Sequence, residues 1–431
     1  MLGQTGVTDT AGVGAAVGVR SPQQVVVGAS QVVIIENADS LVGKVINGEQ
    51  TRELVGNVRI RQDNVRLSCD RAVEYQKSDR IVLTGNVVVI DDSVTMRAPR
   101  GVYHKDERRA EAFDDVRLED GTLQLTALYG EYFIGPRIAF FRSRVTVRDT
   151  GSTLTADSLT YYRDERRSIA RGRATVYNRA ENVTILGNHV EHLAVQQFSR
   201  VTQRPVLMQL ETGEGGRIDT LIVRCRVMEA YRDSAKRLRA IDSVEIVRSE
   251  LAARAGLAEF FTEGDSILLR RSPVVWYENT QVIGDSINVY LDHRTLRLVH
   301  VMGSALAVSQ ADSLRPERFD QVTGETMKMH FVSKVLDHID VEKQATSIYH
   351  LYEDTTPNGL NKTSGDRILL SFDRGRINAI KILGGVEGQY YPENLVNGHE
   401  SEFALPDFLW RTDRPQITAG WQSIQAKLTN K

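Results

Sequence analysis

The sequence has little cysteine, little proline and few aromatic residues. Its 431 residues include two cysteines and ten prolines, and only 7% are aromatic. Two cysteines are too few for a disulfide scaffold or a zinc site, so Cys69 and Cys225 are expected to be small apolar side chains. A single long-range disulfide between them is the alternative. The scarcity of proline leaves long stretches of the chain free to form β-ladders.

Excess charge of one sign and long apolar runs are also missing. Lys and Arg total 54, and Asp and Glu total 56, which argues against binding of nucleic acid through bulk charge. No apolar run reaches the roughly 18 residues that a membrane helix needs. Residues 1–22 lack the basic start and the leucine-rich core of a secretion signal, so no export signal is visible there.

The sequence contains no recognisable catalytic or metal-binding motif. It has no Gly-x-Ser-x-Gly elbow and no phosphate-binding P-loop. His189 and His192 have a metal-like spacing, but positions three apart on a strand face opposite sides. Acidic pairs such as Asp91-Asp92 are expected at turns, where Asp bonds to the backbone. We therefore expect a protein that is not an enzyme and that holds no metal or cofactor.

A short motif recurs every 29 residues between Leu54 and Tyr177. A tyrosine followed five positions later by an arginine keeps nearly the same period. The copies of the motif are Gly56-Asn57-Val58, Gly85-Asn86-Val87, Asp114-Asp115-Val116, Ser143-Arg144-Val145 and Gly172-Arg173-Ala174, and the tyrosine–arginine pairs are Tyr75/Arg80, Tyr103/Arg108, Tyr132/Arg137 and Tyr161/Arg166. A period in this range indicates stacked repeats, which offer a long surface and seldom a single catalytic cleft.

Within each repeat, apolar residues alternate with polar ones. In the first unit Val58 and Ile60 point to one face, residues 62–64 supply a turn, and Val65 and Leu67 form the apolar side of the returning strand. The four residues between the tyrosine and the arginine supply a second turn. Two turns per period indicate two strands of about ten residues running up and down. This favours an antiparallel meander over a parallel β-helix or a leucine-rich repeat.

The pattern continues, with interruptions, along most of the chain. Pro205 and a glycine-rich run interrupt it, and it resumes at Tyr231. Residues 251–261 have helical propensity but lie in repeat register, so a strand is expected there. The predicted organisation is a flexible N-terminus (1–24), a first array (25–196), a junction (197–217), a second array (218–310), longer hairpin repeats that continue it (311–400) and a C-terminal tail (401–431).

The apolar face of the strands either fills a packed core or lines an open groove that would suit acyl chains. The residues at these positions in the first array are Val58, Ile60, Leu67, Val87, Val89, Met96, Val116, Leu118, Leu125, Val145, Val147 and Leu154. The arginines of the tyrosine–arginine pairs either lie solvated at the edge or form a basic rim for phosphate or carboxylate groups. These arginines are Arg80, Arg108, Arg137 and Arg166.

The repeats resemble the OstA-like family, which includes the lipopolysaccharide-transport proteins LptA and LptC and the N-terminal domain of LptD. The Gly-Asn-Val units and the Ala-Asp strand at residues 154–161 (LTADSLTY) carry this resemblance. Two longer segments, SPVVWYENTQVIGDSI at 272–287 and LWRTDRP at 409–415, look like the larger OstA-like proteins of Bacteroidetes-type bacteria. The resemblance covers most of residues 31–415.

This resemblance implies an all-β fold: an elongated antiparallel β-jellyroll, or β-taco, folded into a V and built from two consecutive OstA-like arrays. It also implies a bridge or adaptor of the periplasm that carries lipopolysaccharide, or another lipid A-type lipid, toward the outer membrane in the apolar groove. The expected partners are that lipid and other OstA-like jellyroll proteins joined by strand addition. A head-to-tail homo-oligomer is also expected as a possible assembly, and binding of nucleic acid is not expected.

Two other functions are compatible with the repeat pattern. The first is a structural β-solenoid scaffold with a packed interior and with edges that bind protein partners. The second is a carbohydrate-active solenoid enzyme, which would need carboxylates and aromatic residues clustered on one exposed strand face. The low aromatic content and the position of the acidic residues at turns disfavour this enzyme.

Overall fold

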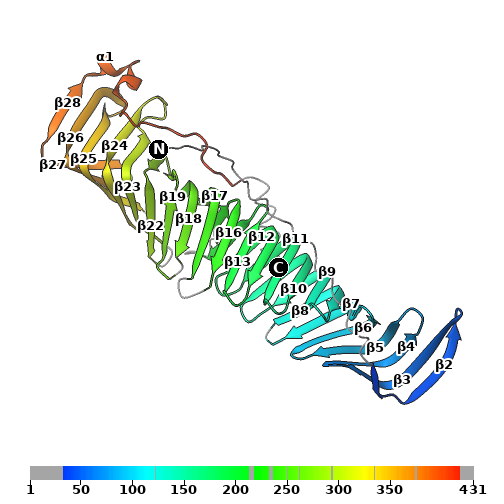
Figure 1. Ribbon diagram of the computed structural model, residues 1–431. Helices are drawn as coiled ribbons and strands as arrows, with labels where there is room; N and C mark the ends of the chain where they lie inside the picture. The colour runs from blue at the N-terminus through cyan, green and yellow to red at the C-terminus, as the bar shows by residue number, and fades with distance from the viewer. Residues whose placement is uncertain are drawn as a thin grey trace, which may run out of the picture.

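The protein is an elongated stack of β-strands (Figure 1). Its structure is a computed structural model that describes residues 33–417, except residues 122, 213–217, 233–235, 250, 262, 293–294, 334 and 374–375. The strands β2 and β3 lie at one end of the stack and β26, β27 and β28 lie at the other. All 28 described strands are hydrogen-bonded into one sheet, which confirms the all-β prediction. The predicted flexible segment 1–24 lies outside the described residues.

The strands of the N-terminal half are mostly 11 or 12 residues long and follow the predicted period. They are β1 (Ile34–Asn37), β2 (Ser40–Ile46), β3 (Glu49–Gln62), β4 (Val65–Tyr75), β5 (Arg80–Asp91), β6 (Val94–His104), β7 (Arg109–Asp120), β8 (Leu123–Phe133), β9 (Ile138–Arg148), β10 (Ser152–Tyr162), β11 (Arg167–Asn178) and β12 (Val183–Leu193). From β3 onward each pairs antiparallel with the next strand in the chain, as β3 does with β4 and β4 with β5, whereas β1 and β2 both pair with β3. The two turns per period predicted from the sequence are therefore confirmed.

The second half contains shorter strands and then very long ones. They are β13 (Phe198–Thr202), β14 (Val206–Thr212), β15 (Ile218–Arg224), β16 (Val227–Tyr231), β17 (Arg237–Arg248), β18 (Leu251–Phe261), β19 (Ser266–Arg270), β20 (Val274–Tyr277), β21 (Thr280–Ile283), β22 (Ser286–Asp292), β23 (Thr295–Gln310), β24 (Phe319–Val332), β25 (Val335–Glu353), β26 (Thr356–Asp373), β27 (Arg376–Leu383) and β28 (Glu387–Tyr391). The strand expected at residues 251–261 is confirmed as β18, so tertiary context overrides its helical propensity.

A break in register at the middle of each long strand folds the sheet lengthwise into two facing walls. In β3 the break lies between Val55 and Val58. Wall A contains β1, residues 58–62 of β3, residues 65–69 of β4 and the equivalent halves of later strands. Wall B contains β2, residues 49–55 of β3 and residues 71–75 of β4. Buried apolar residues of both walls form one continuous cluster between them.

The Gly-Asn motif that marks the repeats lies at the corner between the two walls. Gly85 and Asn86 both have positive φ angles, +77° and +44°, which glycine and asparagine adopt most easily. A side chain at Gly85 would overlap the Asp70 side chain on the neighbouring strand. Asp157, in the Ala-Asp strand, faces Gly172 in the same way. The two sequence motifs are therefore the two sides of one corner.

The segment 197–217, expected to be a junction, carries two strands of the same sheet. β12 pairs with β13 along one half and with β14 along the other. Gln203 and Arg204, which separate β13 from β14, both have positive φ and form the corner. The strand-and-corner pattern thus continues through this segment although the Gly-Asn motif does not. The glycine-rich run at 213–216 lies outside the described residues.

The C-terminal segment packs on the outer face of wall A. It contains the helical turns α1 (Glu393–Val396) and η2 (Glu400–Phe403). Val396 and Leu405 are buried against Leu306 on the side of β23 that faces away from the interior. Arg318 is fully buried and forms ion pairs with carboxylates of this segment. Residues 404–417 are therefore a strap that is hydrogen-bonded to the outer face of wall A. Separately, no described helix is long and apolar enough to cross a membrane.

Replacing Gly85 by alanine is expected to destabilise the protein. The new Cβ would meet the Asp70 side chain, and alanine disfavours the left-handed backbone, so we expect a loss of about 1–3 kcal/mol in the free energy of unfolding. Thermal unfolding followed by circular dichroism measures it. Gly135→Ala is the control, because nothing lies within 4 Å of that position. Equal melting temperatures for both variants would contradict the corner assignment.

Candidate functional site

The twelve predicted groove residues all lie in the interior between the walls. Ten of them are buried, and Val147 and Leu154 are half-buried against the same cluster. Val116 has 0% of its surface exposed, and Phe141 from β9 fills the space beside it. The structure therefore brings these residues together as a packed interior. Their role in lipid binding stays a prediction.

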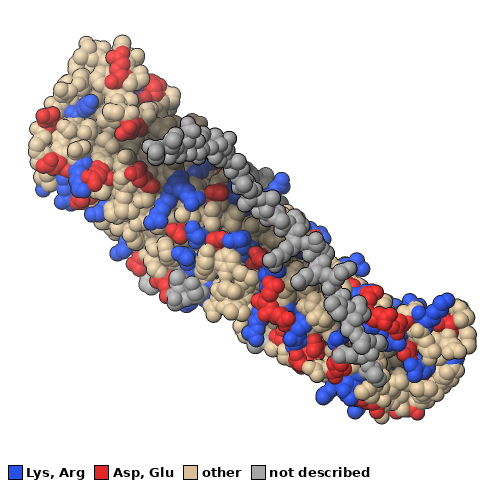
Figure 2. Space-filling view, in the orientation of Figure 1, with Lys and Arg blue, Asp and Glu red and all other residues tan. Residues whose placement is uncertain are grey.

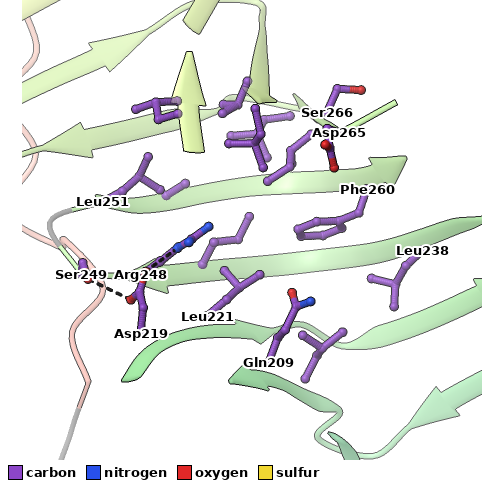
Figure 3. Close-up of a pocket in the computed structure, with 18 of the residues that line it drawn as sticks. Gln209, Asp219, Leu221, Leu238, Arg248, Ser249, Leu251, Phe260, Asp265 and Ser266 are labelled. Carbon is purple, nitrogen blue, oxygen red and sulfur yellow. Dashed lines mark hydrogen bonds and ion pairs between the residues drawn. The ribbon is translucent and has the colours of Figure 1, made fainter. Parts of the chain in front are cut away.

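An open hollow lies farther along the same interior. Its volume is about 370 Å³, and its lining extends from Glu181 to Leu296, which places it near the lower end of small-molecule sites, about 300–1,000 Å³. Figure 3 shows Leu221, Leu238 and Phe260 pointing into it from β15, β17 and β18. All three are only half-buried. The hollow is thus an apolar space between walls that elsewhere pack tightly.

A row of tyrosines bridges the two rims over the N-terminal half. Tyr132 at the end of β8 in wall B donates a hydrogen bond to Asp91 at the end of β5 in wall A, 2.7 Å away. Tyr161 donates in the same way to Asp120 at 3.0 Å, and Tyr103 to Gln62. Each partner lies 41 residues earlier in the chain. We call these three contacts the latches, because they close the interior on its open side.

Two arginines of the predicted basic rim reinforce the latches. Arg108 pairs with Asp63 at 2.9 Å, and Arg137 with Asp92 at 2.6 Å, in each case across the two rims. Arg80 instead lies 4.9 Å over the Tyr75 ring. Arg166, the fourth, follows in the turn after β10. Arg108 and Arg137 therefore hold carboxylates of the protein itself, and their capacity for a ligand phosphate stays a prediction.

Sequence reasoning missed the acidic partners of the tyrosines. Asp91 was expected to be a turn residue, but it ends β5 and its carboxylate is held by Tyr132 and by Arg163 at 3.2 Å. The signal was present in the constant 41-residue offset between acceptor and tyrosine. It went unused because neither hairpin pairing nor strand alternation relates residues three strands apart.

Burial keeps the latch tyrosines protonated. Burial raises the pKa of Tyr132 to about 12, and its hydrogen bond to Asp91 acts in the same direction. Burial likewise raises the pKa of Tyr103 and of Tyr161 to about 12. A neutral phenol can donate a hydrogen bond and a phenolate cannot, so the latches remain formed at neutral pH.

The hollow begins where the row of latches ends. His192 occupies in β12 the place that Tyr161 has in β10, one residue before the strand ends. Its Nδ1 lies 3.0 Å from Ser199 Oγ on the adjacent strand of the same wall, so it does not bridge the rims. Ala230 and Phe260 hold the equivalent places in β16 and β18. Neither has a hydroxyl group, and the mouth between the rims stays open.

The remaining candidate residues of the sequence are the two cysteines and a pair of histidines. Cys69 and Cys225 are free thiols buried at corners, so the long-range disulfide is not formed. Burial raises the pKa of each to about 11, which keeps them unreactive. The described residues contain no cluster of three or more metal-ligating side chains, His189 and His192 included. Figure 2 shows basic and acidic residues interspersed, with no large patch of one sign on the visible face.

Removing one latch hydroxyl is expected to lower stability. Tyr132→Phe leaves the buried Asp91 carboxylate with Arg163 alone, which should cost about 1–3 kcal/mol in the free energy of unfolding. Tyr75→Phe is the control, because the described structure gives that hydroxyl no hydrogen bond. Urea denaturation of the two variants measures the difference. Equal losses would mean that the Tyr132 hydroxyl does not hold the rims together.

Latch tyrosines also predict a stability loss at alkaline pH. Their pKa in the folded protein, about 12, is above the ordinary 10.0, so their stabilisation is complete below pH 10 and is lost as the pH rises toward 12. Between pH 10 and 12 the free energy of unfolding should fall with pH less steeply in Tyr132→Phe than in the wild type. The two slopes should differ by about 1.4 kcal/mol per pH unit. Denaturation series at several pH values test this, and parallel pH profiles would refute it.

A family model matches part of the repeat region. Residues 30–81 and 75–171 match the family model described as OstA-like protein. No curated protein matches the chain. Among solved structures, LptH of Pseudomonas aeruginosa, the LptA-homologous periplasmic component of the conserved lipopolysaccharide transport device, is 17% identical, with a TM-score of 0.26 over 33% of this chain and 95% of that chain. The two matched segments together span residues 30–171, about a third of the chain, and this part of the chain is similar to OstA-like proteins.

Proposed function

We propose that the protein is a non-enzymatic lipid-binding bridge of the periplasm that carries lipopolysaccharide toward the outer membrane. The observation that carries the proposal is the apolar hollow, which opens along the mouth between two β-walls. The OstA-like match supports the same function, because the resemblance implies transport of lipid A-type lipids in the groove of a jellyroll.

The hollow suits acyl chains for a simple physical reason. The half-buried leucine and phenylalanine side chains of its lining leave apolar surface exposed, and contact of this surface with water is unfavourable. Each methylene buried there contributes about 0.8 kcal/mol without any directional contact, so a lipid can slide while remaining bound. A volume of about 370 Å³ accommodates part of a multi-chain lipid. The other acyl chains of that lipid would lie along the open mouth of the hollow.

In this proposal the twelve buried groove residues of the first array extend the same path. They lie between the same two walls as the hollow and belong to one cluster with part of its lining, including Leu207 and Leu269. A lipid reaches them when the latches separate. The rim arginines Arg108 and Arg137, released from Asp63 and Asp92, then become donors for phosphate groups.

The ends of the sheet provide the connections to partners. β2 pairs with β3 alone among the described strands, so its outer edge is unpaired. Leu41 and Val45 on this strand are exposed by 55% and 69%. Exposed edge strands accept further strands. Other OstA-like jellyrolls, or a second copy joined head to tail, are the proposed partners.

Photocrosslinking tests whether lipid occupies the hollow. A photoreactive phenylalanine analogue at Phe260 should capture lipopolysaccharide in cells, because that side chain points into the hollow. Phe113 provides the control, since it packs against Tyr129 on the outer face of wall B. The same analogue at Val116 reports whether the path extends into the first array.

A crosslink at Phe260 with none at Phe113 is the expected result. Equal labelling at both positions would mean that the lipid only adsorbs to the surface of the protein. No labelling at Phe260 would refute the hollow as a lipid site. Both residues are aromatic in the native chain, so the substitution perturbs them to a similar extent.

A structural scaffold is the second candidate, because the first array is packed and latched. With Val116 and Phe141 fully buried, this half of the molecule resembles a stiff strut more than a channel. A scaffold would bind protein partners at its edges and carry no lipid. Native mass spectrometry of protein extracted from membranes separates the two functions: persistent lipid adducts favour transport, and their absence favours the scaffold.

A further inference from the structure

We infer that the ring contact between Tyr277 and Phe331 closes one end of the hollow and limits the length of the acyl chain that the hollow accepts. This inference rests on the proposed lipid-binding function and concerns the same hollow. It follows from the direction in which the hollow extends and from the side chains that lie at its C-terminal end.

The hollow is longer along the stack of strands than along the strands themselves. On wall A its lining comes from six neighbouring strands, which are β12, β14, β15, β17, β18 and β20. The spacings between these strands add up to a length of about 24 Å. Along β20 the lining extends only from Val275 to Tyr277, about 7 Å. An extended acyl chain in the hollow therefore lies across the strands, parallel to the stack.

An aromatic pair joins the two rims at the C-terminal end of the hollow. Tyr277 is the last residue of β20 in wall A, and Phe331 is the last residue but one of β24 in wall B. Their ring centroids lie 5.3 Å apart with an interplanar angle of 78°, which is an edge-to-face contact. Tyr277 belongs to the lining of the hollow, whereas Phe331 lies just beyond the lining and is buried. The pair therefore forms an end wall.

The interior behind this end wall is packed. The lining of the hollow includes no described residue of β24 or of any later strand. Met327 and Met329, which alternate with Phe331 on the inner face of β24, are 0% and 1% exposed. Val341 on the neighbouring β25 is 0% exposed. A chain that reaches the ring of Phe331 can thus extend farther only by displacing it.

Phe331 occupies the position of the repeat that carries the latch tyrosines. Like Tyr132 in β8, it is the last residue but one of a strand that ends at the rim of wall B. Tyr132 reaches the opposite rim with its hydroxyl group, and Phe331 reaches it with its ring. Its size therefore sets where the hollow ends. Each methylene of a shorter chain gains burial, and any part of a longer chain stays in water at the mouth.

A series of alkylphosphocholines with chains of eight to eighteen carbons tests the inference. Each is used below its micelle concentration and competes with a neutral fluorescent apolar probe bound to the full chain. In the wild type the affinity should rise about fourfold with each added methylene until the chain reaches Phe331, and then stay level. Phe331→Ala should move this plateau to chains about two to four carbons longer, because the ring buries as much apolar surface as that many methylenes.

Two further variants complete the test. Tyr277→Ala removes the other ring of the pair from a half-buried position and should also move the plateau to longer chains, which keeps the test decisive if Phe331→Ala fails to fold. Phe372→Ala is the matched control. It removes the same side chain from the same position of the repeat in β26, farther from the hollow, and should leave the plateau unchanged.

The outcomes separate the end wall from lipid binding itself. A wild type without a plateau, or a plateau at the same chain length in every variant, would overturn the end wall and leave lipid binding in place. An equal shift in Phe372→Ala would also overturn it, because the effect would then be general loosening of the interior. Failure of every chain length to displace the probe would overturn the hollow as a lipid site.

Discussion

The bend at the middle of each strand is the constraint on which the rest of the structure depends. A flat antiparallel meander of this length would expose its apolar face along the whole chain, and only closure of the face on itself removes it from water. In β3, β5, β9 and β11 two consecutive residues with positive φ make the bend, as Gly85 and Asn86 do in β5. Because the bends lie in register, the sheet folds along one line and creates both a buried interior and a pair of rims.

The chemistry of the rims then decides where that interior is closed. Over the first array a phenol on one rim reaches a carboxylate or an amide on the other, as Tyr132 reaches Asp91, and the apolar side chains beneath pack without space. Farther along, His192 bonds within its own wall and Phe260 has no polar group to offer. Among the described residues there, no tyrosine hydroxyl bridges the two rims, and the hollow remains. The residue at one position of the repeat therefore distinguishes the two segments: it is a tyrosine where the interior is packed and a residue without a hydroxyl group where the interior is open.

Local pattern was enough to predict the strands, the turns and the inward-facing residues, because alternation and turn chemistry act over a few neighbouring positions. The function of the Gly-Asn motif was not visible in the same way. Gly56 was used to count repeats, and only the overlap with Asp39 shows that it turns a corner. The strap at residues 404–417, the buried Arg318 and the hollow could not be predicted, since they depend on residues 75 to 136 positions apart. No periodicity relates such residues, and side-chain volumes on two facing walls must be known together to locate a void.

The spacing of the latches has an energetic consequence for any lipid that passes through the first array. Opening the three tyrosine latches together would cost several kcal/mol, at about 1–3 kcal/mol for each of the two hydrogen bonds to a carboxylate and about 1 kcal/mol for the one to the Gln62 amide. Opening one latch to a carboxylate costs about as much as one to four buried methylenes contribute. Because the three latches lie in successive repeats, the walls can separate at one of these repeats while the other two stay closed. A lipid would then advance by exchanging one latch for the next, and the closed repeats on either side would keep the rest of the interior dry.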